Sequence, residues 1–243
     1  MYMEVKIAVC SHCSSNQLVK NGRTKYGSQR CLCKECGKSR VPFSKGTGVD
    51  FRTLLILKLF RERLSLRGII RTFGISWQKL YSLFNAHVKG LMPHRHSVRK
   101  PGQDDVLEYD ELCSYVGRKA HKQWLWTAIS RQTRQIVAWV IGDRSNATFK
   151  RLLRKVPPEY LNKRSYSDHW KAYRILLSKG NHKMTGKGDG ETCHMERWNC
   201  TLRQRISRFV RRTLSFSKKK RYHHMATKLF IWFYNMEVKP STL

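Results

Sequence analysis

Acidic residues are scarce in this chain. Of its 243 residues, 16 are Asp or Glu and 49 are Lys or Arg, which gives a formal net charge of +33. Long apolar runs are missing as well: stretches such as 136–141 are far too short to span a bilayer, and the N-terminus lacks a signal-peptide pattern. These absences exclude a membrane-spanning chain and argue against an exported one. We therefore expect a cytoplasmic protein.

The large positive charge indicates a polyanionic partner. Nucleic acid is favoured over an anionic membrane surface, although basic amphipathic segments also bind lipid. A carboxylate that faces nucleic acid repels the phosphates unless a divalent cation lies between them. The few acids are therefore candidate metal ligands. The length allows one large domain or two to three small ones.

Five of the eight cysteines lie between Cys10 and Cys36. Two CxxC pairs, Cys10/Cys13 and Cys33/Cys36, are separated by 19 residues, and each pair can turn both thiolates toward one tetrahedral zinc ion. A site closed by four cysteines is structural, since no position stays open for a substrate. We predict one structural Zn²⁺ that folds a ribbon over residues 1–46.

Two other residues near this cluster are potential ligands, His12 and Cys31. Both are weaker candidates than the four cysteines, because only the two CxxC segments supply two thiols each at the same spacing. Basic residues crowd the same segment, which favours a ribbon that contacts DNA over a merely solvated surface. The remaining cysteines stand apart and are expected to be small buried hydrophobes; these are Cys113, Cys193 and Cys200.

Residues 50–90 carry apolar side chains at three- and four-residue spacings, which predicts helices. Gly74 suits the left-handed conformation that ends one helix and Ser76 suits the cap of the next, so a short turn joins helices at 65–72 and 76–87. We interpret the segment as a helix-turn-helix DNA-binding domain, with an ordinary helical hairpin as the alternative. The outward-facing residues near the start of the recognition helix, where base edges are read, are Gln78, Lys79 and Ser82.

Residues 91–102 contain two prolines and no periodicity, so they are predicted to be a linker to a domain over 103–243. In that domain the expected order is three strands, helix, strand, helix, strand, helix. The predicted elements are 106–109, 124–130, 136–141, 146–156, 163–167, 170–177, 181–185 and a helix from about residue 191. This is the order of the ribonuclease H-like fold. The predicted class is therefore α/β, with a ribonuclease H-like domain preceded by a zinc ribbon and a helix-turn-helix.

Three acids fall where that fold brings carboxylates together. Asp110 follows the first strand, Asp168 ends the fourth, and Glu196 lies on the last helix. Such acids hold two divalent ions about 4 Å apart, one activating the attacking water or 3′-hydroxyl and the other stabilising the leaving oxygen. Mg²⁺, or Mn²⁺ in its place, suits an all-oxygen site.

Each of these acids also has an ordinary structural interpretation. Asp110 ends a strand at a turn, Asp168 caps the next helix, and Glu196 forms a helical pair with Arg203. Their coincidence at three topological positions in an acid-poor chain favours the metal site.

The nearest rivals for the metal site are Glu111, Asp143 and Glu191. Glu111 is expected on the opposite side of the strand from Asp110, because side chains alternate along a strand. Asp143 is expected in the turn after the third strand.

With these residues in view, the chain resembles transposases of the insertion sequence one family of bacterial and archaeal mobile elements over nearly its whole length. The segments that carry the resemblance are 10–13, 33–37, 110–116, 142–145, 167–170, 196–199 with 202–203, and 212–218. The resemblance implies that Asp110, Asp168 and Glu196 are the catalytic acids of a DDE transposase. It also matches Arg203 to a basic residue seven positions after the family's glutamate. His169 and Cys113 stand where relatives usually have Gly and Trp.

A dense basic stretch follows the last acid, and it favours a track along a phosphate backbone over a solvated helix face. The predicted DNA contacts in it are Arg203, Arg205, Arg208, Arg211, Arg212 and residues 218–221. After it, an apolar stripe at helical spacing is expected to be core or dimer interface; it consists of Met225, Leu229, Trp232 and Met236.

The sequence thus predicts a DNA transposase that acts on double-stranded DNA. The ribbon and helix-turn-helix bind the terminal inverted repeats, and the catalytic domain cleaves strands and transfers 3′-hydroxyl ends into target DNA. Two ends must be paired, so a homodimer or larger assembly is expected, associated with the prokaryotic nucleoid and not with a membrane. The alternatives are a non-catalytic zinc-dependent DNA-binding regulator or inactive transposase copy, and a ribonuclease H-like nuclease that does not join strands.

Overall fold

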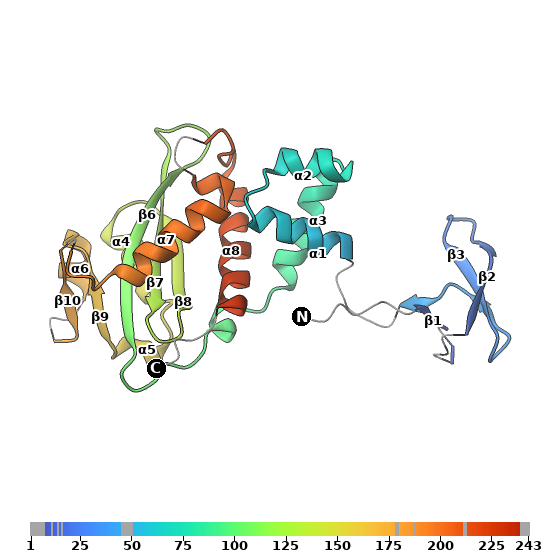
Figure 1. Ribbon diagram of the computed structural model, residues 1–243, viewed down its shortest axis with the longest axis horizontal. Helices are drawn as coiled ribbons and strands as arrows, with labels where there is room; N and C mark the ends of the chain where they lie inside the picture. The colour runs from blue at the N-terminus through green and yellow to red at the C-terminus, as the bar shows by residue number, and fades with distance from the viewer. Residues whose placement is uncertain are drawn as a thin grey trace. The chain divides into compact units, whose positions relative to one another are not determined.

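The computed structural model describes residues 8–10, 12, 13, 15, 17–44, 51–177, 180–186, 188–210 and 213–238. The chain divides into two compact units, residues 1–54 and residues 55–243. Figure 1 labels the main helices and strands of both units. Within the described ranges, no helix combines the length and the apolar character needed to cross a bilayer.

The first unit contains short antiparallel strands. β1 (Ala8–Val9) pairs with β5 (Phe43–Ser44), and a three-stranded sheet has the order β2-β3-β4. The bounds of its strands are Leu18–Arg23 for β2, Gln29–Cys33 for β3 and Ser39–Arg40 for β4. After β3 the backbone turns at Gly37, which has a left-handed φ of 67° and donates its N–H to the Cys33 carbonyl. A residue without a Cβ takes this conformation without strain, so the chain can fold back toward the cysteines.

A mixed five-stranded sheet forms the centre of the second unit, in the order β10-β9-β6-β7-β8. The bounds are Val106–Tyr115 for β6, Lys122–Ser130 for β7, Ile136–Gly142 for β8, Arg164–Ser167 for β9 and His182–Met184 for β10. The first three strands are antiparallel neighbours, whereas β9 runs parallel to β6 and β10 parallel to β9. All five predicted strands are present. β6 continues beyond Tyr109, because Asp110 and Glu111 stay paired with Thr127 and Trp126.

Two helical layers cover the two faces of this sheet (Figure 1). One consists of α4 (Asn146–Leu153), α5 (Pro158–Leu161) and α6 (Lys171–Leu176), and the other of α7 (Cys193–Arg205) and α8 (Lys220–Glu237). Side chains alternate along β6: Tyr109 packs in the core with α4 and α6, and Leu112 in the core with α7 and α8. The two faces of β6 therefore meet different helices.

α8 departs in part from the predicted apolar stripe. Met225 and Leu229 are buried as expected, but Met236 is 53% exposed. The cause is Asn235, whose side-chain amide accepts the N–H of Ile136 at 2.8 Å and donates to its carbonyl at 2.9 Å. This pair of hydrogen bonds fixes residue 235, and not residue 236, against the start of β8.

Three helices precede the sheet: α1 (Phe51–Arg61), α2 (Leu66–Phe73) and α3 (Trp77–Gly90). The turn between α2 and α3 has the predicted chemistry. Gly74 has a φ of 58° and donates its N–H to the Ile70 carbonyl, and the Ser76 hydroxyl accepts the N–H of Lys79. The short 3₁₀ helix η1 (His94–Ser97) follows, in a segment where the sequence predicted no element.

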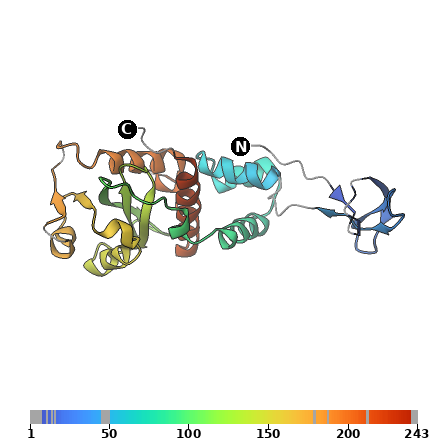
Figure 2. The same ribbon diagram turned by 90° about the horizontal axis from the view of Figure 1, so that it is seen from below.

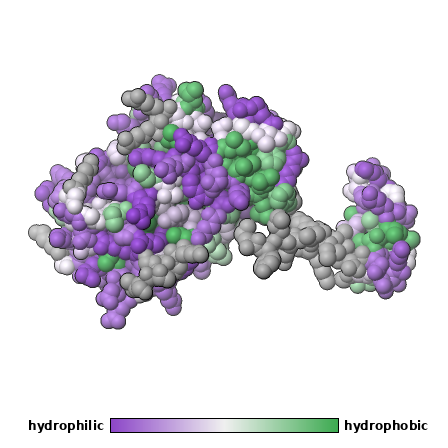
Figure 3. Space-filling model, viewed as in Figure 1, coloured by the Kyte–Doolittle hydropathy of each residue, from purple (hydrophilic) through white to green (hydrophobic). Residues whose placement is uncertain are grey.

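Helices α1 to α3 pack on the same core as α8. Phe60 and Phe84 lie with their ring centroids 5.0 Å apart, and both belong to the cluster that includes Leu229 and Phe230. Figures 1 and 2 both show α8 between the sheet and these helices. In Figure 3 hydrophobic surface gathers over α1 to α3, whereas hydrophilic residues dominate the surface around the sheet. The helices therefore have a defined position relative to the sheet through a shared apolar core.

Candidate metal centres

The four predicted zinc ligands lie together. The Sγ atoms of Cys10 and Cys36 are 3.6 Å apart, those of Cys13 and Cys33 are 3.6 Å apart, and all four lie within 4.8 Å of one another. In a tetrahedral site with Zn–S bonds of about 2.3 Å, the sulfur atoms are separated by about 3.8 Å. The cluster therefore fits a single zinc ion.

Backbone N–H groups favour the thiolate forms of two of these cysteines. The N–H groups of Cys13 and His12 lower the pKa of the Cys10 thiol to about 6, and the N–H of Cys36 lowers the pKa of Cys33. Burial and the neighbouring thiols instead raise the pKa of Cys13. The thiolate is the form that binds a metal ion. Neither spare candidate belongs to the cluster: His12 lies 2.8 Å from the Lys38 ammonium, and Cys31 is paired within the sheet.

The second centre is a cluster of acids, Asp110, Glu111 and Asp168, with carboxylate oxygens within 4.8 Å of one another. Strand register brings them together. Tyr109 of β6 lies opposite Ser167 of the parallel strand β9, so the next residue on each strand is an aspartate. Two of the three predicted acids are therefore neighbours, although 58 positions separate residues 110 and 168 in the sequence.

Asp110 points toward α7. Its two carboxylate oxygens accept the Asn199 side-chain N–H at 2.6 Å and the Glu111 backbone N–H at 2.8 Å. Burial, and then the negative charges of Glu111 and Asp168, raise the pKa of Asp110 to about 7. Asn199 Oδ1 is buried, and no described residue donates a hydrogen bond to it. Carboxylate and amide oxygens that crowd together in this way fit a divalent cation of the Mg²⁺ type.

Glu111 occupies the opposite face of β6, as strand alternation predicts. It accepts the Tyr173 hydroxyl at 2.6 Å and the Arg144 Nε at 2.8 Å, and Arg144 in turn lies over the Trp170 ring at 3.7 Å. One of its carboxylate oxygens nevertheless lies within 4.8 Å of those of Asp110 and Asp168, which strand alternation alone does not predict. β9 ends at Ser167, so beside Asp168 no strand backbone separates the two faces, and carboxylates from both faces approach it.

Asp168 and Glu196 line one cavity of about 600 Å³ together with Asp110, Glu111, Asn199 and Arg203. Asp168 also accepts the Trp170 N–H at 3.0 Å, but it does not cap α6, because Trp170 occupies the N-cap position of that helix. Glu196 and Arg203 share the cavity side of α7, since their spacing is two helical turns. Glu196 accepts the Thr192 hydroxyl at 3.3 Å and lies outside the acid cluster. Its assignment as the third catalytic acid stays a prediction.

The two other rivals have structural partners elsewhere. Asp143 accepts the hydroxyls of Ser145 and Thr148 at the start of α4, and these bonds lower its pKa. Glu191 pairs with Arg131 at 2.6 Å. These contacts leave neither acid in the cluster.

Sequence reasoning missed the buried acid Glu108, which accepts the Met195 N–H at 2.8 Å and pairs with Arg131 and His194. It anchors the first turn of α7 to β6. Strand alternation could have predicted its position, because residues 108, 110 and 112 lie on the same face of β6.

The predicted DNA-contacting residues lie in different surroundings. Gln78, Lys79 and Ser82 are exposed on α3, as the sequence predicts. Arg205 pairs with Glu62, and Arg208 donates to the Ser217 hydroxyl at 2.9 Å. Arg211 and Arg212 lie outside the described residues. Contact of all these residues with DNA stays a prediction.

The three isolated cysteines, Cys113, Cys193 and Cys200, are exposed, so the expectation that they are buried is wrong. On α7 the buried apolar side chains are Met195, Trp198 and Leu202, whereas both cysteines of that helix are exposed.

Comparison with known proteins connects this region to one family. Residues 106–236 match the family model described as IS1 transposase. The Shigella dysenteriae protein "Insertion element iso-IS1n protein InsB" is 36% identical over 126 residues, which cover 52% of this chain and 93% of the relative. "Insertion element IS1 4 protein InsB" of Escherichia coli (strain K12) is 35% identical over 138 residues, covering 56% and 80%. The region of the family model contains the whole five-stranded sheet and the acid cluster, and the cysteine cluster precedes it.

Proposed function

The chain belongs to the IS1 transposase family, and from this premise we propose that it is a DNA transposase that cleaves element ends and transfers their 3′-hydroxyls into target DNA. The observation that carries the proposal is the cluster of Asp110 and Asp168 in a chain with 16 acids and 49 basic residues. A carboxylate cluster in a DNA-binding protein repels its substrate unless a divalent cation joins the two.

The fold proposed for residues 103–243 is ribonuclease H-like. It is supported by the strand order β10-β9-β6-β7-β8, with three antiparallel strands followed by two parallel ones. Asp110 on the central strand and Asp168 after its parallel neighbour occupy positions at which that fold carries metal ligands. Glu196 on α7 is the proposed third acid.

We assign Asp110 and Asp168 as ligands of Mg²⁺ or Mn²⁺, with Glu196 completing the set. When bound, such ions lower the pKa of the attacking water or hydroxyl and stabilise charge on the phosphate oxygens. Asn199 orients the Asp110 carboxylate through its 2.6 Å hydrogen bond. Arg144 and Tyr173 hold Glu111 in place, so that it adds negative charge beside Asp168 while its own oxygens stay engaged.

DNA binding is proposed for the segments outside the catalytic cavity. Residues 1–46 form a ribbon around one structural zinc ion, and residues 50–90 act as a helix-turn-helix with α3 as the recognition helix. Support comes from the exposure of Gln78, Lys79 and Ser82 on α3 and from the net charge of +33. Residues 91–102 connect these parts to the catalytic domain. The two ends of an element are brought together by a dimer or larger assembly.

The proposal is tested with DNA that carries one element end, incubated with target DNA and Mg²⁺. We expect Asp168→Asn to lower strand cleavage and transfer by about 10³-fold or more, because a metal ligand contributes several kcal/mol to the barrier. Binding of the element end is retained in this variant. The matched control is Glu159→Gln, which removes an exposed acid on α5 and should keep full activity.

Each alternative has its own outcome in this assay. Nicks without a covalent joint between end and target indicate a nuclease. End binding by the unaltered chain with no cleavage in Mg²⁺ or Mn²⁺ indicates a regulator or an inactive copy. Full activity of Asp168→Asn contradicts the site assignment.

A further inference from the structure

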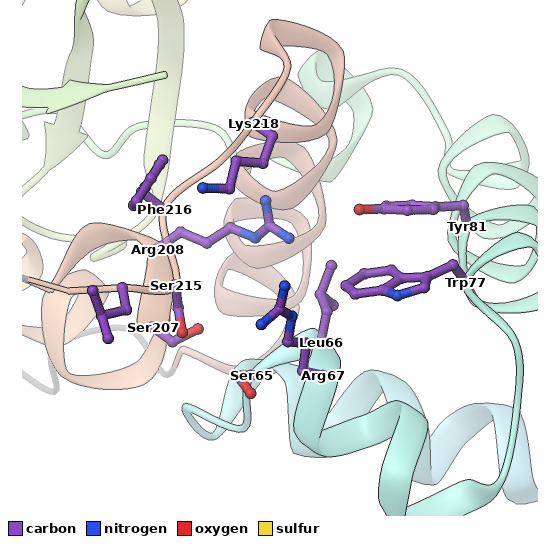
Figure 4. A pocket seen from close by; sticks show the side chains of 11 residues that line it. Ser65, Leu66, Arg67, Trp77, Tyr81, Ser207, Arg208, Ser215, Phe216 and Lys218 are labelled. Atoms are coloured by element: carbon purple, nitrogen blue, oxygen red, sulfur yellow. The ribbon is translucent and has the colours of Figure 1, made fainter. Parts of the chain in front are cut away.

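A second cavity of about 420 Å³ lies between α2 and α3 on one side and residues 207–218 on the other. Figure 4 shows Trp77 and Tyr81 entering it from α3, with Arg208 and Lys218 on the opposite wall and Arg67 on α2. Its volume is within the range of about 300–1,000 Å³ that small-molecule sites have. It shares no lining residue with the cavity of the acid cluster.

Aromatic rings form a column that ends in this cavity. Tyr222 stacks on Tyr81 with ring centroids 4.0 Å apart and planes 17° apart, and Tyr81 stacks on Trp77 at 5.6 Å and 21°. Trp77 is the last ring of the column and is 40% exposed, although tryptophan is among the largest apolar side chains. One further planar ring placed on Trp77 extends the column and covers that apolar surface.

The walls of the cavity are positively charged. Three cations line it, Arg67, Arg208 and Lys218, and none of the described lining residues carries a carboxylate. Arg208 is the least exposed of the three: its guanidinium contacts the hydroxyls of Ser217 and Tyr81, and burial lowers its pKa. A half-buried cation whose described partners are neutral is stabilised by an anion. The cavity therefore combines a stacking platform with an anion site.

The positive charge continues beyond this cavity. Lys218 also lines a neighbouring one, whose other walls include Arg118, His121, Lys219 and Lys220. Together the two cavities form a basic track, which suits a ligand with successive phosphates better than a single nucleotide. At its other end, Trp77 is the first residue of α3 and directly precedes the exposed Gln78 and Lys79.

We propose that this cavity binds an unpaired nucleotide of a DNA strand, with the base stacked on Trp77 and the phosphates against Arg67, Arg208 and Lys218. The inference rests on the proposed function for its DNA partner and deepens it. A base within a duplex has both faces covered by neighbouring bases, so only an unpaired or extruded base can stack on the indole. Every base has a π-face, so the site tolerates any sequence.

The test compares three DNA molecules that contain the fluorescent base 2-aminopurine: a fully paired duplex, the same duplex with that base unpaired in a bulge, and the single strand. The full-length protein is used without divalent metal, so no strand is cut. We expect fluorescence quenching on binding of the bulged and single-stranded DNA. Trp77→Ala should weaken binding of these two by roughly 10-fold and reduce the quenching, with a smaller effect on the paired duplex.

Three matched variants separate stacking and charge from folding. Trp77→Phe keeps an aromatic ring and should retain most of the affinity for unpaired DNA. Leu161→Ala truncates an apolar side chain that is 52% exposed on α5 and should bind like the unaltered chain. Arg67→Ala should lower the salt dependence of binding to unpaired DNA by about one phosphate contact, whereas Lys150→Ala, on α4, should not.

Equal losses on paired and unpaired DNA in Trp77→Ala overturn the proposal, and so does a free deoxynucleotide that binds as tightly as the single strand. If Trp77→Ala unfolds, the comparison of Arg67→Ala with Lys150→Ala decides the question, and an unchanged salt dependence in both overturns it. Failure of the proposed function is a separate result. It is detected in the Mg²⁺ assay, as strand cleavage by Asp168→Asn, and it does not change 2-aminopurine binding, which is measured without metal.

Discussion

The cysteine cluster and the acid cluster are both sets of metal-binding side chains, but they are assembled in different ways. The four cysteines come from two short CxxC segments, and their Sγ atoms already have the spacing of a tetrahedral site. The acids come from β6 and from the end of β9, which only strand register brings together. Local sequence is enough for the first site, whereas the second exists only in the folded sheet.

The two clusters also differ in how their negative charge is stabilised. Backbone N–H groups lower the pKa of Cys10 and Cys33, although burial and the neighbouring thiols raise the pKa of Cys13. In the acid cluster, burial and like charges raise the pKa of Asp110. A closed set of four thiols is typical of a structural ion, and a buried acid with a raised pKa that lines an open cavity is typical of a catalytic site. The comparison therefore supports zinc in one and Mg²⁺ or Mn²⁺ in the other.

The largest effect is expected from breaking the cysteine cluster. Cys33→Ser removes a buried ligand, and we expect it to release zinc and unfold the ribbon, because structural zinc sites contribute about 10–16 kcal/mol of apparent folding free energy. Metal analysis and circular dichroism of the purified chain measure both changes. Cys31→Ser is the matched control, since Cys31 lies two residues away and outside the cluster. Unaltered zinc content in Cys33→Ser contradicts the four-cysteine assignment.

Mild acid should distinguish the two regions, because it lowers the stability of the second unit and releases zinc from the first by different mechanisms. In the second unit, burial lowers the pKa of His223 and of His94 to about 4, from an ordinary value of 6.5. Below pH 6.5 the unfolded chain takes up protons that the folded chain does not, so stability is complete above pH 6.5 and is lost progressively toward pH 4. At 1.36 kcal/mol per pKa unit, the full loss is about 3 kcal/mol for each histidine.

Urea unfolding at pH 7.5 and pH 5, followed by tryptophan fluorescence, measures this loss. The imidazole of His223 contacts the Ser114 and Ser217 hydroxyls, so His223→Gln should lower the pH dependence and retain polar contacts. Zinc release in the same pH range has a separate cause, which is competition of protons for the thiolates. A free energy of unfolding that is flat between the two pH values contradicts the prediction for the histidines.

The smallest effects should separate the two acids on β6. Asp110→Asn removes a buried like charge, and we expect the metal-free chain to gain roughly 0.5–2 kcal/mol of stability while metal-dependent activity is lost. Glu111→Gln should instead lose roughly 1–3 kcal/mol, because Arg144 and Tyr173 lose a charged acceptor. Thermal melting without metal and isothermal titration with Mn²⁺ measure the two responses. Stability changes of the same sign in both variants contradict the distinction between a ligand and a structurally engaged acid.

Much of the fold was predictable because the relevant signals are local. The five strands lie within two residues of their predicted starts, except that β6 continues beyond Tyr109. Gly74 and Ser76 form the turn between α2 and α3 with the expected hydrogen bonds, since a left-handed glycine and a helix cap depend on a few neighbouring residues. The zinc ligands were predictable for the same reason.

Errors arose where distant elements decide the outcome. Glu111 belongs to the acid cluster because β9 ends beside it, and residue 235 of α8 is buried because its amide binds the backbone of Ile136. Neither interaction is visible in the spacing of residues along one helix or strand. The cavity at Trp77 is a similar case, because α3 supplies the rings and residues 207–218 supply the opposite wall.

The ligand types, the CxxC spacing, the positions of most helices and strands and the excess of positive charge can be derived from the sequence, because each depends on residue identity or on neighbours within one or two turns. The three-dimensional fold, in contrast, sets which acids share a site and which basic residues border a stacking platform. Strand register and helix packing join residues that are far apart in the chain, and those pairings depend on burying apolar surface over the whole sheet.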